Sequence, residues 1–347
     1  MPLERARRSL VAGLIAWMIP LEVLAKDASN VPFNTGVFSG VSTPAIETQN
    51  FAWLVTGICA AIFVVVVVVG AITIIRFRKR PGDDDREPPQ IYGSNPLELA
   101  WTVIPLIIVF ILAIVTARTI AELQIDEMPE GWMPVTVVGH QWWWEFQYPE
   151  YGITTANELH IPLGEAGAGR PTFLTLESED VIHSFWIPLL SGKIDVIPNR
   201  NNHLWFDPLE TGLFVGQCSE YCGTQHANML LRVYVHTPEE FKRWAANQQR
   251  DAVENVAVNR GREVFLTTAC INCHTVKGTV ATGQFGPDLT HLMSRHTLGA
   301  GVAPLTAANL RDWVADPAHL KPGARMPAMG VEGRALDHLI AYLMTLK

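Results

Sequence analysis

The chain has 347 residues, which is enough for two soluble domains plus membrane segments. Its formal net charge is −8, and we expect no nucleic-acid partner. The acidity is local: residues 119–250 contain 7 Lys+Arg against 17 Asp+Glu, whereas residues 1–118 contain 10 against 9 and residues 251–347 contain 9 against 8. An acidic domain favours a basic partner through electrostatic steering, although a solvated acidic face without a partner is also common.

The N-terminal segment has the pattern of a signal peptide over residues 1–25. Arginines precede an apolar stretch over residues 10–24, and Ala25 offers a small residue at a cleavage point. A retained third membrane helix is the alternative, because Pro20 and Glu22 do not forbid one. The stretch is short for a membrane span, which favours the cleaved signal.

Two longer apolar segments predict a transmembrane helical hairpin within residues 26–118. The spans cover residues 51–75 and about 97–117. A basic cluster at residues 76–80 follows the first span and places the connecting loop in the cytoplasm. Everything after the second span then faces the periplasm or its equivalent.

Short β-strands are predicted after the hairpin. Four segments alternate or are β-branched, and Gly and Pro separate them. They cover residues 134–138, 172–176, 202–206 and 230–235. Such spacing is typical of an all-β sandwich or barrel. Residues 238–250 predict a helix that leaves this domain, and a third unit begins near Asp251.

One loop of the β-domain is dense in soft metal ligands. Cys218, Cys222, His226 and Met229 recur every three or four residues, and His183 lies upstream. Thiolate, imidazole and thioether ligands together select copper for electron transfer, and this set is large enough for two coppers. A Cys218–Cys222 disulfide is the alternative, but it leaves the histidines and the methionine unexplained.

The C-terminal unit carries a second redox motif. Cys270, Cys273 and His274 form a C-x-x-C-H sequence, the attachment signal for c-type haem. The two thiols form thioethers with the haem, and the histidine becomes the proximal iron ligand. A redox-active disulfide would not need His274.

These motifs resemble two known families. The copper loop is similar to the dinuclear copper centre (CuA) of subunit II of haem–copper cytochrome oxidases, and the last hundred residues resemble class I cytochrome c. The resemblance implies a multidomain membrane protein with a two-helix transmembrane hairpin, an all-β cupredoxin-like domain over residues 119–250 and an all-α cytochrome c domain over residues 251–347.

The resemblance also implies a role for each copper ligand. Cys218 and Cys222 would bridge the two coppers. His183 and His226 would bind one copper each. Met229 and the backbone carbonyl of Glu220 would be weak axial ligands, and the Glu220 side chain would help to bind Mg²⁺ at the contact with subunit I.

The haem ligands follow in the same way. The segment 285–289 resembles the one whose proline, here Pro287, packs on the proximal histidine. Met326 is followed directly by a proline, as the distal ligand is in the family, and Met329 is the rival ligand. Ligation by histidine and methionine raises the reduction potential, as a respiratory relay requires.

Three further residues take roles from the resemblance. Trp142, the first of three consecutive tryptophans, would be the place where electrons enter the copper centre. Glu98 would lie at the mouth of a proton channel into subunit I, although an acid at a helix N-terminus also complements the macrodipole. A fused haem as internal donor puts the usual cytochrome-docking role of the acidic surface, including Asp180, in doubt.

The sequence therefore predicts the electron-input subunit of a proton-pumping cytochrome c oxidase. Its partners would be subunits I and III and a cytochrome c or membrane electron donor, and its membrane the cell membrane, crossed more than once, with the copper and haem domains on the outer side. Oxygen would be reduced in subunit I. Alternatives are the corresponding subunit of a CuA-containing nitric oxide reductase, which Glu98 disfavours, a membrane-anchored copper-delivery module and a stand-alone electron carrier.

Overall fold

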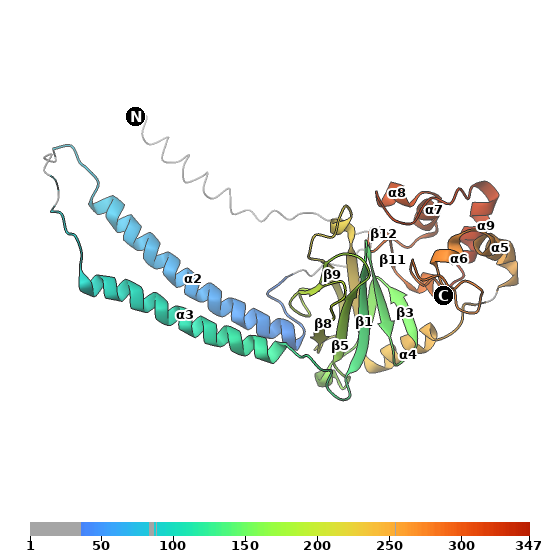
Figure 1. Ribbon diagram of the computed structural model, residues 1–347, viewed down its shortest axis with the longest axis horizontal. Helices are drawn as coiled ribbons and strands as arrows, with labels where there is room; N and C mark the ends of the chain where they lie inside the picture. Colours follow the sequence, from blue (N-terminus) through green and yellow to red (C-terminus); the bar gives the residue numbers. More distant parts are fainter. Residues whose placement is uncertain (1–35, 83–86, 88, 254) are drawn as a thin grey trace. The chain divides into compact units, whose positions relative to one another are not determined.

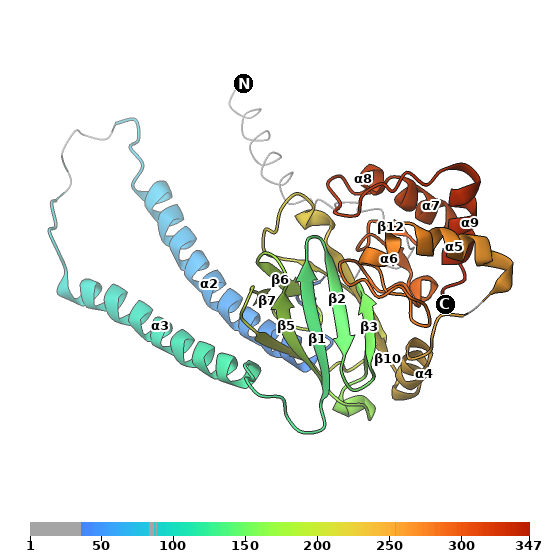
Figure 2. The same cartoon turned by 45° about the vertical axis from the view of Figure 1, so that its right-hand side comes forward.

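A computed structural model describes residues 36–347, apart from residues 83–86, 88 and 254. The expected signal peptide over residues 1–25 lies outside the described residues. The chain from residue 36 onward forms one compact unit that contains two hydrophobic cores. Figures 1 and 2 show its helices and strands.

Two long helices, α2 (Thr43–Arg76) and α3 (Asn95–Leu123), form the hairpin. They have 34 and 29 residues, whereas about 20 suffice to cross a bilayer. The valines at positions 64–69 are each 48–63% exposed, as side chains in contact with lipid are. The helix α2 begins eight residues before the apolar run, because a proline sits in its first turn, where the fixed φ suits a helix start.

Both outer ends of the hairpin are tied to the β-domain. Thr43 Oγ1 donates to Asp207 Oδ2 at 2.9 Å, next to the start of α2. Trp205 Nε1 donates to the carbonyl of Leu123, the last residue of α3, at 2.9 Å. The start of α2 and the end of α3 are therefore both held to the β-domain by hydrogen bonds.

The β-domain is a sandwich of two five-stranded sheets. One sheet has the order β3-β2-β1-β5-β8 and the other β4-β10-β9-β6-β7. The strands are β1 (Met133–His140), β2 (Trp143–Tyr148), β3 (Ile153–Ala156), β4 (Glu158–Pro162), β5 (Thr172–Ser178), β6 (His183–Trp186), β7 (Ile194–Val196), β8 (Asn202–Phe206), β9 (Gly212–Cys218) and β10 (Leu230–His236). The four predicted strands correspond to β1, β5, β8 and β10. Each sheet contains one parallel pair, β1 with β5 and β4 with β10.

Aromatic side chains fill the space between the sheets. Trp144, Phe146, Phe185 and Phe206 are completely buried. Trp144 packs edge-on against Phe185, with ring centroids 5.1 Å apart. This packing fixes β2 of the first sheet against β6 of the second, and β6 carries the first candidate copper ligand.

Short helices build the C-terminal domain. After α4 (Pro238–Gln248) come α5 (Asn259–Thr267), α6 (Cys270–Cys273), α7 (Ala307–Ala315), α8 (Pro317–Leu320) and α9 (Gly333–Leu343), with a small hairpin of β11 (Thr297–Leu298) and β12 (Ala303–Pro304). Single 3₁₀ turns are η2 (Glu165–Gly167), η3 (His226–Asn228), η4 (Val256–Val258) and η5 (Leu292–Ser294). The helices α5 and α9 cross closely at Gly261, where any side chain would collide with the carbonyl of His338.

Candidate copper and haem sites

Two neighbouring strands bring the candidate copper ligands together. His183 begins β6 and Cys218 ends β9, and these strands pair antiparallel, with Phe185 opposite Cys218. The loop after β9 then returns Cys222 to the same place. The ligand atoms of His183, Cys218 and Cys222 lie within 4.8 Å of one another, and all three residues are buried. His183, which is distant in sequence, thus joins the two cysteines of the loop in one cluster.

The sulfur atoms form a chain of short contacts. Cys218 Sγ lies 3.7 Å from Cys222 Sγ and 3.9 Å from His183 Nδ1. Cys222 Sγ lies 3.7 Å from His226 Nδ1 and 3.8 Å from Met229 Sδ. A disulfide needs about 2.05 Å between the sulfurs, so the two thiols are free. Each of the five side chains expected to bind copper therefore contacts at least one cysteine sulfur.

The two thiols cannot both ionise easily at this distance. The hydrogen bond between the two thiols lowers the pKa of Cys218 well below its usual value, and the same contact raises the pKa of Cys222. A positive metal cluster would stabilise both thiolates, so the donor set fits a pair of coppers.

The backbone supplies one more donor. The carbonyl oxygen of Glu220 lies 3.2 Å from Cys218 Sγ, and its role as an axial ligand stays a prediction. The Glu220 side chain is exposed.

Asp180 orients the first histidine. Its Oδ1 lies 2.9 Å from His183 Nε2, which turns Nδ1 toward the sulfurs. The backbone N–H groups of Gln141 and Val181 also donate to this carboxylate, each at 2.7 Å. Burial raises the pKa of Asp180, but the hydrogen bonds from His183 and the backbone outweigh burial and lower it. Sequence analysis considered Asp180 only as a docking residue; the signal for this role was an acid three residues before a ligand histidine.

The tryptophan-rich β1–β2 hairpin covers the copper loop. Trp142 Nε1 and Gln141 Nε2 both donate to the carbonyl of Cys222, at 3.0 Å and 2.7 Å. Gly139 lets the hairpin approach, because a Cβ there would lie 2.9 Å from the His183 ring. The predicted site of electron input, Trp142, is thus one hydrogen bond away from a predicted copper ligand.

The haem motif lies beside a large cavity of about 1260 Å³. Cys270 and Cys273 are the first and last residues of α6, and His274 follows them. The Nδ1 atom of His274 lies 2.7 Å from the carbonyl oxygen of Pro287, which leaves Nε2 free to bind iron. Burial lowers the pKa of His274 and keeps the ring neutral. The contact of Pro287 with His274 is this backbone hydrogen bond, and packing of the proline ring on the histidine stays a prediction.

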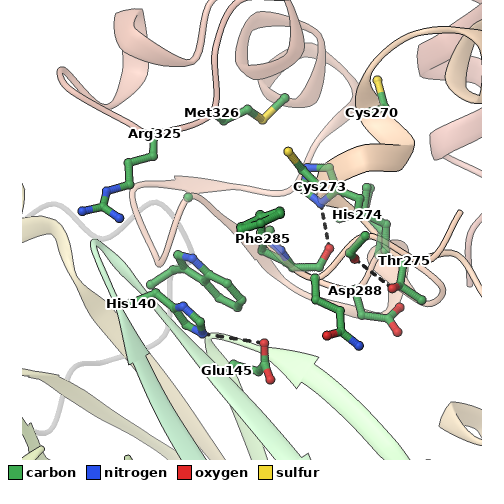
Figure 3. Close-up of a pocket in the computed structure, with 18 of the residues that line it drawn as sticks. His140, Glu145, Cys270, Cys273, His274, Thr275, Phe285, Asp288, Arg325 and Met326 are labelled. Carbon is green, nitrogen blue, oxygen red and sulfur yellow. Dashed lines mark hydrogen bonds and ion pairs between the residues drawn. The ribbon is translucent and has the colours of Figure 1, made fainter. Parts of the chain in front are cut away.

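The cavity has walls from both domains. Figure 3 shows Cys270, Cys273, His274 and Met326 around it together with His140 and Glu145 of the β-sandwich. Met326 and Met329 both line the cavity, so the choice between them as axial ligand remains a prediction. A cavity with two thiols and an imidazole in a C-x-x-C-H turn fits a covalently bound haem.

Glu98 lies in the first turn of α3 and is exposed. One of its carboxylate oxygens accepts a hydrogen bond from the backbone N–H of Ser94 at 3.2 Å. This is the contact of an acid at a helix N-terminus. It leaves the expected proton-channel role a prediction.

The geometry defines a class of protein: a chain with two helices long enough to cross a membrane, a cupredoxin-like β-sandwich and a c-type cytochrome domain. Family models agree with this in three places. "Cytochrome C oxidase subunit II, transmembrane domain" matches residues 31–118, "Cytochrome C oxidase subunit II, periplasmic domain" matches residues 153–235, and "Cytochrome c" matches residues 258–347.

Curated relatives cover most of the chain. A protein named cytochrome c oxidase subunit 2 from Alkalihalophilus pseudofirmus is 36% identical over 84% of this chain and 84% of its own length. Proteins of the same name from Bacillus sp. strain PS3 and Bacillus subtilis are each 34% identical, over 78% and 73% of this chain and 80% and 74% of their own lengths. A crystal structure of the periplasmic domain of subunit II of cytochrome oxidase from Bradyrhizobium japonicum is 30% identical, with a TM-score of 0.33, and covers 35% of this chain and 97% of that one.

The chain belongs to the cytochrome c oxidase subunit 2 family, with a C-terminal cytochrome c domain. It is a component of an oxidoreductase complex and a membrane protein with a periplasmic domain. Its families imply that it binds copper and haem c.

Proposed function

We propose that this chain is the electron-input subunit of a proton-pumping haem–copper cytochrome c oxidase. It would take electrons from a cytochrome c or a membrane donor at its haem domain and deliver them, through CuA, to subunit I, where O₂ is reduced to water. One observation carries the proposal. The same chain holds a buried cluster of His183, Cys218 and Cys222, whose ligand atoms lie within 4.8 Å of one another, and a cavity lined by the residues of the C-x-x-C-H motif. Two candidate redox sites in one chain suit an electron relay.

The copper assignment follows the contacts of the sulfur cluster. Cys218 and Cys222 would bridge two coppers, His183 and His226 would bind one each, and Met229 and the Glu220 carbonyl would complete the set. A bound copper pair would take up one electron and share it between the two metals. The strands β6 and β9 hold their ligands in place through the sandwich core, and Asp180 orients His183. Such fixed ligands keep rearrangement small when the charge changes.

The haem assignment rests on the cavity beside α6. Cys270 and Cys273 would carry the thioethers, and His274 and Met326 would be the axial ligands. The haem supplies a reversible one-electron centre at high potential. The Pro287 carbonyl holds His274 in the ring orientation that ligation needs.

The remaining roles face the partner subunits. Trp142 would pass electrons toward the copper loop, which its hydrogen bond to the Cys222 carbonyl supports. Glu98 would accept protons at the mouth of a channel in subunit I, since ionisable groups near membrane depth are usually functional. The exposed Glu220 side chain would help to hold Mg²⁺ at the contact with subunit I. Subunit III would complete the core of the complex.

We further propose the cell membrane as the location, with both redox domains on its outer side. The four basic residues within 76–80, at the end of α2 and the start of its connection to α3, support a cytoplasmic connection. The proposed limits are residues 1–25 for the signal peptide, 26–118 for the hairpin, 119–250 for the copper domain and 251–347 for the haem domain.

Complementation tests this function directly. In cells that lack the subunit, the full chain should restore O₂ uptake with reduced cytochrome c as donor. Cys218→Ser should restore none while its haem stays covalently attached. Cys59→Ser changes an exposed cysteine of α2 outside both sites and should behave as the wild type. Full O₂ uptake with Cys218→Ser would contradict the proposal.

A further inference from the structure

Lys321 joins the two soluble domains from a buried position. Lys321 is only 3% exposed. The Nζ atom donates to the carbonyl oxygens of Trp142 at 2.7 Å, Asn228 at 2.8 Å and Gly299 at 2.8 Å. These carbonyls belong to the tryptophan hairpin, to the copper loop and to the haem domain. The three N–H groups of an ammonium thus connect three segments that are far apart in sequence.

Such a group is costly to bury. Burial lowers the pKa of Lys321 to about 7, and an unpaired buried charge is strongly unfavourable. The buried ammonium needs hydrogen-bond acceptors, and the three carbonyls surround it together only when the two domains have the observed relative arrangement. A rotated or shifted arrangement would leave the ammonium with fewer acceptors, so the contact selects one register.

The residues that follow Lys321 continue the contact up to the candidate haem ligand. We call residues 321–326 the methionine loop. Gln225, which is buried in the copper loop, donates through Nε2 to the Pro322 carbonyl at 2.6 Å. Arg325 Nη1 lies 3.5 Å from Asp180 Oδ2, on the carboxylate that orients His183. The methionine loop, which brings Met326 to the haem cavity, therefore contacts two residues beside the copper cluster, Gln225 and Asp180.

A second buried contact lies at the start of β4. Glu158 is 1% exposed, and its Oε1 accepts from the backbone N–H groups of His296 and Thr297 at 2.8 Å and 2.9 Å. Arg232 Nη1 donates to the Thr297 hydroxyl at 3.2 Å, and the Tyr234 ring stacks on His296. Two separate buried polar contacts prevent the haem domain from pivoting about either one.

We propose that Lys321 is a positioning residue for electron transfer within this chain. It fixes the methionine loop on the tryptophan hairpin and the copper loop, so that the haem cavity and the copper cluster move as one body. The Trp142 face then has a permanent internal partner and is closed to external cytochromes. The expected effect on electron transfer from haem to copper rests on the proposed function. The contact between the haem domain and the β-sandwich rests only on the hydrogen bonds described above.

The test compares Lys321→Met with Lys242→Met, which removes an exposed lysine of α4, in the full haem- and copper-loaded chain. Hydrogen–deuterium exchange measures docking, and flash reduction of the haem measures its rate of electron loss to copper. Lys321→Met should speed exchange in residues 141–144, 226–230 and 297–301 but not in α5 and α9. Electron transfer from haem to copper should be measurably slower than in the wild type, because the tunnelling rate falls exponentially as the separation of the two centres grows.

Both optical spectra should stay unchanged in Lys321→Met, and Lys242→Met should match the wild type. Unchanged exchange and transfer in Lys321→Met would overturn the proposal, and so would exchange that rises equally throughout the haem domain. If Lys321→Met loses its copper or haem spectrum, Arg325→Gln decides the question, because the Arg325 side chain is 60% exposed and belongs to neither hydrophobic core. It should speed exchange at residues 141–144, and no change there would refute the docking role of the loop. A wild-type chain without a two-copper signal would refute the proposed function but not the docking.

Discussion

Replacing Asp180 with asparagine should weaken copper binding without unfolding the domain. The carboxylate accepts hydrogen bonds from two backbone N–H groups and faces His183 Nε2 at 2.9 Å. An asparagine has the same shape, but its amide nitrogen can only donate. It would face at least one of these donors, so the imidazole would lose its fixed orientation toward the sulfurs.

The size of the effect follows from the role of such outer partners. Loss of a group that orients a metal-binding histidine typically lowers metal affinity by about 10–100-fold, or about 1.4–2.7 kcal/mol at about 1.4 kcal/mol per tenfold. Competition with a chelator of known copper affinity measures this in the full chain. Asp195→Asn, at an exposed position on β7, is the matched control. The reasoning is refuted if Asp180→Asn binds copper as tightly as Asp195→Asn.

Three other predictions concern the haem domain and its contact with the sandwich. Gly261→Ala should destabilise the haem domain by about 3 kcal/mol, at the upper end for overpacking, because backbone of α9 blocks the added methyl group; denaturant unfolding followed by haem absorption measures this. The hydrogen bond to Glu158 raises the pKa of His296, and burial and the like charge of Arg232 reduce this effect without cancelling it. The contribution of this pair to stability is therefore fully present below about pH 6.5 and is lost as the pH rises through the folded pKa. Thermal unfolding should show this loss in the wild type and not in His296→Gln. Met326→Ala should retain covalent haem, lose the sulfur ligand and lower the haem potential in a redox titration; an unchanged potential would transfer the ligand role to the methionine three residues later.

Local sequence spacing predicted the parts of the sites that lie within one segment. Cys218, Cys222, His226 and Met229 are close in the fold because a single loop carries them, and the C-x-x-C-H motif is a single turn. Alternation and β-branching located four of the ten sandwich strands. The shorter strands, such as β7 with three residues, carry too few residues for a period-2 pattern to be visible.

Contacts between distant segments could not be read from the sequence. Lys321 is a buried cross-domain donor only because three carbonyls from three segments converge on it. Glu158 gives no local signal either, since its partners lie about 140 positions further along the chain. Charged residues are usually on the surface, so composition alone assigns both to solvent. Tertiary packing decides their environment.

Low-temperature electron paramagnetic resonance on the full chain, with copper and haem quantified, can distinguish a dinuclear from a mononuclear copper site. We expect a signal from one electron shared equally by two coppers, together with one covalently bound low-spin haem. Cys218→Ser should abolish the shared signal and keep the haem. A mononuclear copper signal, or no copper signal with a Cys218–Cys222 disulfide, would contradict the dinuclear centre and leave a membrane-anchored cytochrome.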